Sequence, residues 1–430
     1  MRRPACGLVP SSIAAQSWLF FARNWSVMDP KGGGNGMRIP TYIDRYPAKM
    51  VSKLASRLIE RYAKDGDSVF DPFCGSCAVL VAAKDKNMRV SGVDVNPVAP
   101  LFGRVKLSGF VKEHALELFD SALKRVASSG PMVIKWEKKN FWFSAATIRK
   151  FEFIRAAVDS IPNRQEPEYS AILLALYLSV RLCSRADQRS PKPFISKTAT
   201  QDRRGIHYDP IKTTRYLIEE LSYYYCADNR RSNKFDVLTT TDVSRKGALK
   251  GLMKAHSHVI TSPPYINAQD YYRNFKLELH ILEDVLPFKI RDIKERFIGT
   301  ERGDLMLGVE DEEVIASNAL VPQLRAIEAV SVRHANVVRR YFCDMRNALV
   351  NAISVLKPDG VFVLVCGDNL VCGKKIQTWK ILSEIMNGIG MTLFDSFADP
   401  IKDRMLAPKR SGHKGLIKEE MVLAFRRDRV

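Results

Sequence analysis

Three features common in other protein classes are missing from this sequence: a long apolar run, a dense set of cysteines and an internal repeat. Its longest apolar run extends from Ala171 to Leu178, far short of the roughly 20 residues that a membrane-spanning helix needs. The eight cysteines are too sparse in 430 residues for a disulfide framework, and several stand inside apolar runs, as reduced thiols do. We therefore exclude a membrane protein and a disulfide-stapled scaffold, and we expect a reducing, cytoplasmic location.

Positive charge, by contrast, is present in excess. Lysine and arginine total 67 against 47 acidic residues, which gives a formal net charge of +20. With 46% hydrophobic and 27% charged residues, the composition is globular and excludes a disordered tail or a collagen-like fibre. An enzyme for small neutral metabolites has no need of such a charge, so a polyanionic partner, most simply nucleic acid, is the better explanation. The alternative is a basic surface without a specific partner.

Short apolar strands alternate with helical segments, which predicts an α/β fold. Apolar spacing over 50–63 indicates a helix, and it is followed by a strand over 68–71, a helix of small residues over 76–83 and a strand over 89–95. This order is the beginning of a βαβ unit. We expect further strands at 235–238, 258–261, 361–365, 391–397 and 421–425, helices at 147–161, 169–182, 341–356 and 377–386, and a turn at 357–360.

The chain between Asp94 and Phe235 is about 140 residues long, whereas a simple βαβ crossover takes ~30. Most of this stretch has a helical pattern, so we expect a doubly wound, Rossmann-like sheet with an inserted, mainly helical subdomain. The expected organisation is an N-terminal extension and linker at 1–37, the sheet domain at 38–110 and 235–430, and the insertion, a candidate target-recognition region, at 111–234.

The first chemical motif is Asp71-Pro72-Phe73-Cys74-Gly75-Ser76, which lies between a strand and a helix. A turn of small residues there lets backbone N–H groups approach a ligand at the positive end of the helix. Asp94 follows 23 residues later, at the tip of the next strand, where a carboxylate can accept both hydroxyls of a ribose. The arrangement suits a nucleoside-bearing cofactor, although an ordinary turn between a strand and a helix has the same residues.

The second motif is Ser262-Pro263-Pro264-Tyr265, directly after an apolar strand. Two prolines stop the strand, stiffen the chain and offer no N–H group. The Ser262 hydroxyl and the Pro263 carbonyl can then face outward as acceptors, and Tyr265 can lie beneath a planar base. Such a set can hold a flat, amine-bearing heterocycle, although a plain proline turn with a packed tyrosine remains the alternative.

Together these motifs resemble those of the DNA amino-methyltransferases that use S-adenosylmethionine. Residues 71–76 resemble the family's cofactor loop, residues 93–97 its ribose-binding motif and residues 262–265 its catalytic tetrapeptide. The segment 46–49 is similar to the one that covers the methionine part of the cofactor, and residues 366–369 match a late element of the family. The resemblance implies a Rossmann-like methyltransferase sheet with S-adenosyl-L-methionine as cofactor. It implies that Tyr46, Lys49, Asp71, Phe73, Gly75, Ser76, Asp94, Asn96, Pro97 and Asp242 bind this cofactor, although Asp242 fits an ordinary turn equally well.

The cofactor loop departs from the family at Cys77, where the usual Gly-Ser-Gly ends in glycine. Glycine there permits close packing of helix on sheet, and a thiol is only slightly larger, so we expect weakened rather than abolished cofactor affinity. Cys74 and Cys77 also form a Cys-x-x-Cys pair. No second pair stands at ligand spacing, so we expect no metal site.

The resemblance implies that Ser262, Pro263, Pro264 and Tyr265 are catalytic. Serine in the first position is commoner in enzymes that methylate cytosine N4, which predicts a site-specific, cytosine-N4 DNA methyltransferase of a restriction-modification system. The partners would be double-stranded DNA and a cognate restriction endonuclease. The alternatives are an adenine-N6 DNA methyltransferase, an RNA base methyltransferase and an inactive DNA-binding module.

Two basic stretches are candidates for contact with DNA phosphates. Residues 181–215 contain nine Lys or Arg against three Asp, and residues 402–418 form the second stretch. A solvated charged face is the alternative for either. The individual DNA-binding candidates are Arg185, Arg189, Arg203, Arg204, Tyr272 and Arg273.

Overall fold

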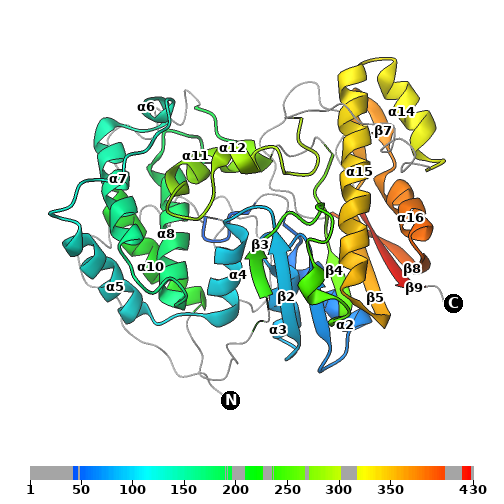
Figure 1. The fold of residues 1–430 in the computed structure, drawn as a ribbon, viewed down its shortest axis with the longest axis horizontal. Helices are drawn as coiled ribbons and strands as arrows, with labels where there is room; N and C mark the ends of the chain where they lie inside the picture. The colour runs from blue at the N-terminus through cyan, green and yellow to red at the C-terminus, as the bar shows by residue number, and fades with distance from the viewer. Residues whose placement is uncertain are drawn as a thin grey trace. The chain divides into compact units, whose positions relative to one another are not determined.

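A sheet of seven strands organises the chain in the computed structural model, which describes residues 42–46, 49–188, 190, 192–195, 209–225, 235, 237–266, 271–301, 317–401 and 419–427 (Figure 1). The strand order is β3-β2-β1-β4-β5-β9-β8; the first five strands run parallel and β9 runs antiparallel to both neighbours. The predicted doubly wound, Rossmann-like sheet is thus confirmed. The strands are β1 (Ser68–Asp71), β2 (Arg89–Asp94), β3 (Val237–Thr240), β4 (His256–Thr261), β5 (Leu356–Cys366), β8 (Met391–Pro400) and β9 (Glu419–Arg427).

Side chains of the sheet alternate between two hydrophobic cores, one on each face. In β1, for example, Phe70 belongs to one core and its neighbour Val69 to the other. Val363 and Leu364 of β5 divide in the same way. Successive strand residues point to opposite faces, so a sheet that is covered on both sides is apolar at nearly every position.

Helices cover both faces of the sheet (Figure 1). One core contains residues of α2 (Ser52–Tyr62), α3 (Ala78–Lys84) and α4 (Ala99–Ser108). The other contains residues of α14 (Leu320–Glu328), α15 (Val332–Ser354) and α16 (Thr378–Gly388). A small hairpin of β6 (Asn369–Val371) and β7 (Lys374–Ile376) and a short 3-10 helix η1 (Lys250–Leu252) complete this part.

The stretch between β2 and β3 is helical beyond α4, and its helices gather beside α4 (Figure 1). Its centre is α8 (Pro167–Cys183), whose side chains from Tyr169 to Leu182 are all buried. A helix that is apolar all round must be surrounded by others, and α4, α5, α10 and α11 all pack on α8. The helices here are α5 (Lys112–Arg125), α6 (Lys139–Trp142), α7 (Ala145–Asp159) and α10 (Pro210–Tyr225), with α11 (Tyr271–Leu282) and α12 (Ile290–Ile293) following β4.

The predicted turn at 357–360 is wrong, because these residues lie within β5. Leu356 pairs with His256, but Val361 pairs with His258, so β5 has more residues than β4 over the same span. The extra residues form an irregular, bulged segment that keeps both ends of β5 in the sheet. The preceding helix α15 accordingly ends at Ser354 rather than at Leu356.

The predicted linker at 1–37 lies outside the described residues. No helix in the described ranges combines the length and the apolar character needed to cross a bilayer.

Candidate active site

The two predicted motifs meet where the direction of strand crossover reverses, between β1 and β4. Parallel strands β1 and β4 are neighbours, with Phe70 opposite Val259, so their carboxyl ends lie at one edge of the sheet. Asp71 ends β1 and Thr261 ends β4, and the Thr261 hydroxyl donates a hydrogen bond of 2.6 Å to Asp71 Oδ1. In doubly wound sheets, ligands bind at this reversal point.

The loop after β1 is held by the two aspartates at the strand ends. Asp71 Oδ1 accepts a hydrogen bond from the Phe73 N–H (3.0 Å), and Asp94 Oδ2 accepts one from the Gly75 N–H (2.9 Å). Asp94 Oδ1 also accepts from the Asn96 N–H (2.8 Å). Gly75 has a φ of +46°, and a Cβ there would lie 3.0 Å from the Tyr46 ring. Glycine is therefore required both by the backbone conformation and by the close approach of the ring.

A cavity of about 790 Å³, including the part that opens to solvent, lies over these strand ends. Both predicted motifs contribute to its wall. Of the predicted residues, Tyr46, Lys49, Asp71, Phe73, Gly75, Ser76, Asp94, Asp242, Ser262 and Pro264 line it.

Asn96, Pro97, Pro263 and Tyr265 do not line this cavity. Asn96 is buried and acts through others: its Oδ1 accepts from the Val98 N–H (3.1 Å) and its Nδ2 donates to the Tyr46 hydroxyl (3.2 Å). Pro97 is buried in the turn before α4. These two residues thus support the wall of the cavity from behind.

The corner after β4 is fixed from several sides. The Tyr341 hydroxyl donates to the Pro264 carbonyl (2.9 Å), and the Tyr265 hydroxyl donates to the Glu420 carboxylate of β9. Gly299, with a φ of +82°, lies so close that a Cβ there would be 2.9 Å from the Tyr265 carbonyl. Ser262 is half-buried and lines the cavity, and its hydroxyl forms no hydrogen bond with the described residues.

A segment before α2 closes the cavity on another side. Tyr46 packs against Gly75, and Asp44 forms ion pairs with Lys49 and with the buried Lys106 of α4 (2.6 Å). Lys106 Nζ also donates to the Ser76 carbonyl (2.8 Å), so one ammonium group joins this segment to the cofactor loop. Burial opposes it, yet the two ammonium groups hold the pKa of Asp44 below its usual value.

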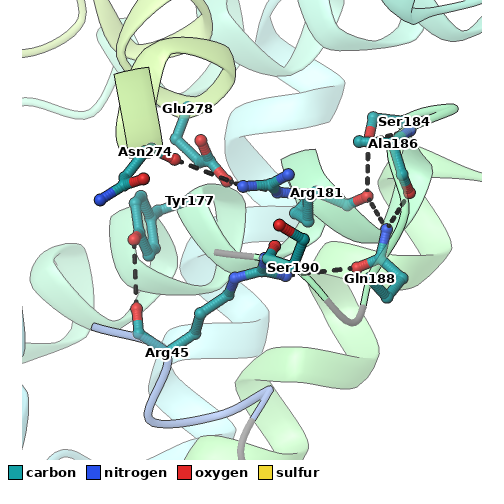
Figure 2. Close-up of polar contacts among 9 residues, drawn as sticks. All are labelled: Arg45, Tyr177, Arg181, Ser184, Ala186, Gln188, Ser190, Asn274 and Glu278. Atoms are coloured by element: carbon teal, nitrogen blue, oxygen red, sulfur yellow. Dashed lines mark hydrogen bonds and ion pairs between the residues drawn. The ribbon is translucent and has the colours of Figure 1, made fainter. Parts of the chain in front are cut away.

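The same segment is fastened to the helical insertion (Figure 2). Arg45 donates from Nη2 to the Ser190 carbonyl (2.9 Å) and from Nη1 to Gln188 Oε1 (3.4 Å), and its own carbonyl accepts from the Tyr177 hydroxyl (3.3 Å). The Tyr42 hydroxyl donates to Glu220 of α10 (3.0 Å). The insertion therefore contributes to the placement of Tyr46.

Arg181 was expected to belong to a basic stretch that contacts phosphates, and the structure contradicts this. It is 2% exposed, and its Nε pairs with Glu278 of α11 at 3.3 Å (Figure 2). Its carbonyl accepts from Gln188 Nε2 (2.7 Å) and from the Ser184 hydroxyl (2.8 Å). The reason is that α8 continues to Cys183, which carries Arg181 into the helical core instead of onto a loop.

The other DNA-binding candidates are only partly described. The Arg185 guanidinium donates to the Asn140 carbonyl (2.9 Å) and the Phe141 carbonyl (3.3 Å) of α6. Tyr272 and Arg273 lie in the first turn of α11, with the Tyr272 hydroxyl bonded to His280 Nε2 (3.2 Å) and Arg273 exposed. Arg189, Arg203, Arg204 and the stretch 402–418 lie outside the described residues.

Cys77 adopts a left-handed conformation with a φ of +63°, immediately before α3. Glycine is favoured at this position for its backbone freedom, and not only for close packing. Cys74 and Cys77 are buried free thiols, and hydrogen bonding with Cys77 together with burial raises the pKa of Cys74 well above its usual value. Among the described residues, no group of three or more His, Cys, Asp or Glu side chains is placed to hold a metal ion.

Two of the three aspartates that line the cavity, Asp71 and Asp94, have raised pKa values. Burial raises the pKa of Asp71 to about 7, against the opposing hydrogen bonds from Thr261 and Phe73, and the nearby Asp94 adds to the rise. Burial likewise raises the pKa of Asp94 to about 6, although N–H groups of Asn96 and Gly75 stabilise its charge. Crowded, partly desolvated carboxylates of this kind attract a cationic ligand.

Sequence reasoning missed one wall of the cavity. Arg296, Phe297 and Ile298 line it, but they lie in a charged helical region without a recognisable motif. The Asp44–Lys106 pair was missed as well, because its members are 62 residues apart and no pattern links them. For the wall at Arg296, the one feature of the sequence that could have indicated it is Gly299, where a sharp turn brings this wall close to Tyr265.

The sheet and the cavity define a Rossmann-like α/β fold with a ligand site at the point where the strand crossover reverses. A family model described as DNA methylase, of the N6/N4 type, matches residues 16–99, which include the cofactor loop and Asp94. The type II methyltransferase M.BsoBI of Geobacillus stearothermophilus is 24% identical, over 58% of this chain and 54% of its own length. M.AvaI of Nostoc sp. and of Anabaena variabilis is 21% identical, over 81% of this chain and 78% of its own length. The chain thus spans about half of the first relative.

Among solved structures, an rRNA methyltransferase, aviRa of Streptomyces viridochromogenes, is 12% identical over 90% of this chain, with a TM-score of 0.30. This likeness is too slight to bear on the fold. The family model and the type II relatives confirm the resemblance that the motifs indicated. The chain is related to the DNA amino-methyltransferases of the N6/N4 family, whose methyl donor is S-adenosylmethionine.

The residues around the cavity fit that donor. Asp94 offers carboxylate oxygens for ribose hydroxyls, and the apolar side chains of Phe73 and Val243 can flank a purine. The raised pKa values of Asp71 and Asp94 show two carboxylates whose charge a sulfonium would stabilise.

We predict that S-adenosylmethionine binds more tightly as pH rises from about 5 to about 8, because a cationic ligand favours the ionised carboxylates. The gain is lost as pH falls through about 7 and about 6, the pKa values of Asp71 and Asp94. Titration calorimetry over this range checks it. S-adenosylhomocysteine, which lacks the sulfonium charge, is the control and should show a shallower dependence; equal slopes for both ligands would contradict the prediction.

We also predict that Lys106→Met weakens cofactor binding by roughly tenfold or more, because the segment with Tyr46 loses its link to Ser76 and the buried Asp44 keeps only one of its two ammonium partners. Dissociation constants and urea unfolding of the same samples provide the measurement. The double variant with Asp44→Asn removes the buried carboxylate charge and should recover stability but not affinity. Recovery of both would show that the pair acts on stability alone.

Proposed function

We propose that this protein transfers a methyl group from S-adenosylmethionine to the exocyclic N4 amine of cytosine in duplex DNA, at a short defined sequence. The observation that carries the proposal is that the cofactor loop and the Ser262–Tyr265 corner, nearly two hundred residues apart, lie at one cavity. The relation to DNA methylases and the net charge of +20 support DNA as the substrate.

When bound, S-adenosylmethionine supplies a methyl carbon whose bond to sulfur breaks as the amine nitrogen attacks, with the electron pair left on a neutral thioether. An amine conjugated to the base is a poor nucleophile, so the protein must favour a tetrahedral nitrogen. The Ser262 hydroxyl, which faces the cavity without a described partner, and the Pro263 carbonyl would accept hydrogen bonds from the amine. The surplus proton on nitrogen then leaves to solvent, and most of the rate comes from positioning and electrostatics.

The corner supplies the rigidity that this role needs. The Pro264 carbonyl is held by Tyr341, which leaves the Pro263 carbonyl as the one without a donor among the described residues. The target base must leave the duplex to reach this point, and Tyr265, anchored through Glu420 at its hydroxyl, would stack on it. The type II relatives favour a place in a restriction-modification system, with a cognate endonuclease as partner.

Adenine N6 is the alternative target, since its amine poses the same chemical problem. Serine in the first position of the tetrapeptide favours cytosine, because the family resemblance associates Asp or Asn there with adenine. An RNA base methyltransferase and an inactive DNA-binding module are supported by fewer observations, and the raised pKa values of two cavity carboxylates speak for a functional cofactor site.

We expect methyl-labelled cofactor and unmethylated duplex DNA to yield label in N4-methylcytidine after digestion to nucleosides. Asp94→Ala is the matched negative control, because it removes the carboxylate at the tip of β2 and should abolish cofactor binding. Label in N6-methyladenosine would replace the cytosine assignment, label only with an RNA substrate would replace DNA, and no label in any base would leave a binding module.

Tyr265→Ala should lower kcat/KM for DNA by roughly 10- to 100-fold, because stacking of a base on an aromatic ring contributes ~1–3 kcal/mol. Cofactor affinity should change little, since Tyr265 does not line the cavity. Tyr265→Phe keeps the ring but loses the bond to Glu420, so its activity should lie between the alanine variant and the wild type. Steady-state kinetics check this, and a phenylalanine variant as poor as alanine would show that the hydroxyl matters more than the ring.

A further inference from the structure

Arg296 lies in the wall of the cavity that no motif indicated. It follows α12 by three residues, is half-buried, and shares the cavity with Ser262 and Pro264. Its neighbours Phe297 and Ile298 are buried and apolar, and Gly299 brings this wall against the Tyr265 carbonyl. The guanidinium therefore stands on the side of the cavity that is formed together with the catalytic corner.

The two cations that line the cavity differ in their surroundings. Lys49 forms an ion pair with Asp44, which it shares with Lys106. Arg296 forms no ion pair and no side-chain hydrogen bond with any residue in the described ranges. A guanidinium offers five N–H donors in a planar fork that matches carboxylate and phosphate oxygens.

The wall of the cavity is negatively charged, so an anionic group of a ligand can bind there only beside a cation. The wall carries three carboxylates, those of Asp71, Asp94 and Asp242, and Asp242 is paired with Arg245 at 3.3 Å. These carboxylates suit a sulfonium and an ammonium, but they repel an oxyanion. An oxyanion that enters this cavity needs a cation that is not already matched, and Arg296 is the lining residue that meets this condition within the described part of the chain.

We propose that Arg296 binds an oxyanion of the bound reactants: the carboxylate of S-adenosylmethionine or the phosphate beside the extruded base. This inference rests on the proposed function. The two sources share one chemistry, a bidentate contact of the fork with two oxygens. The two sources can be told apart by removing the guanidinium. Loss of the carboxylate contact lowers the affinity for the cofactor, whereas loss of the phosphate contact raises the KM for DNA.

The test uses the full chain with Arg296→Gln, which keeps hydrogen-bonding capacity but loses the charge. Calorimetry with S-adenosylmethionine and with decarboxylated S-adenosylmethionine forms the first arm. If the carboxylate is bound, the variant should lose roughly 10- to 100-fold in affinity for the complete cofactor, as expected for a hydrogen bond to a charged group. Its affinity for the decarboxylated ligand should match that of the wild type.

The second arm measures the apparent KM for unmethylated genomic DNA with saturating cofactor. If the phosphate is bound, cofactor affinity stays unchanged and this KM rises by the same factor. Arg291→Gln is the matched control, because Arg291 lies in α12 and is 83% exposed. Arg296→Lys, which keeps the charge without the fork, should recover part of the loss in either arm.

An Arg296→Gln variant that stays within twofold of the wild type in both arms overturns the assignment of Arg296. Equal losses for the complete and the decarboxylated cofactor also overturn it, since they would point to a general disturbance of the cavity. A wild type that binds no S-adenosylmethionine at all refutes the proposed function, and the assignment with it.

Discussion

The hydrogen bond from the Thr261 hydroxyl to the Asp71 carboxylate is the contact on which the site depends. It ties together the ends of β4 and β1, which are neighbours in the sheet although these two residues are 190 positions apart. The register sets Phe70 opposite Val259, and both of these side chains belong to the same hydrophobic core. A slip of one residue would turn one of them to the opposite face, because side chains alternate along a strand. The cofactor loop and the proline corner are therefore placed by one pairing, and each requires the other.

The electrostatics of this arrangement favour a cationic ligand. Asp71 and Asp94 end neighbouring strands, and their loss of solvent is offset only in part by N–H and hydroxyl donors, as their raised pKa values show. The site thus holds unfavourable negative charge before any ligand arrives. In the proposed reaction a sulfonium would relieve that charge and a neutral thioether would not, so the same crowding would favour release of the demethylated cofactor. The donors are already in place and need little reorganisation.

The parts of this structure that sequence could predict are those with local causes. Strand β1 and its loop follow from a short apolar run that ends at Asp71, and the Ser262–Tyr265 corner follows from two consecutive prolines, which end strand β4 at Thr261. The wall at Arg296 and the Asp44–Lys106 pair depend on contacts between distant elements, which no spacing encodes. The bulge at 357–360 was misread because Pro358 and Gly360 also favour turns, and only the pairing of β5 with β4 shows that the strand continues through them. The conformation of Cys77 was hidden for the opposite reason, since cysteine rarely adopts a positive φ.

Arg181 was wrongly predicted to contact phosphates, but the net charge still indicates a polyanionic partner, because paired charges cancel in the sum. Arg181 is matched by Glu278, Arg215 by Asp120 and Lys106 by Asp44, so each pair contributes nothing to the excess of +20. In the net charge, each lysine or arginine of a structural ion pair is offset by its acidic partner. The excess must therefore reside on cations without acidic partners, and these are the ones whose field reaches a polyanion. Composition therefore indicates the charge of the proposed partner, although it cannot tell which arginines would contact it.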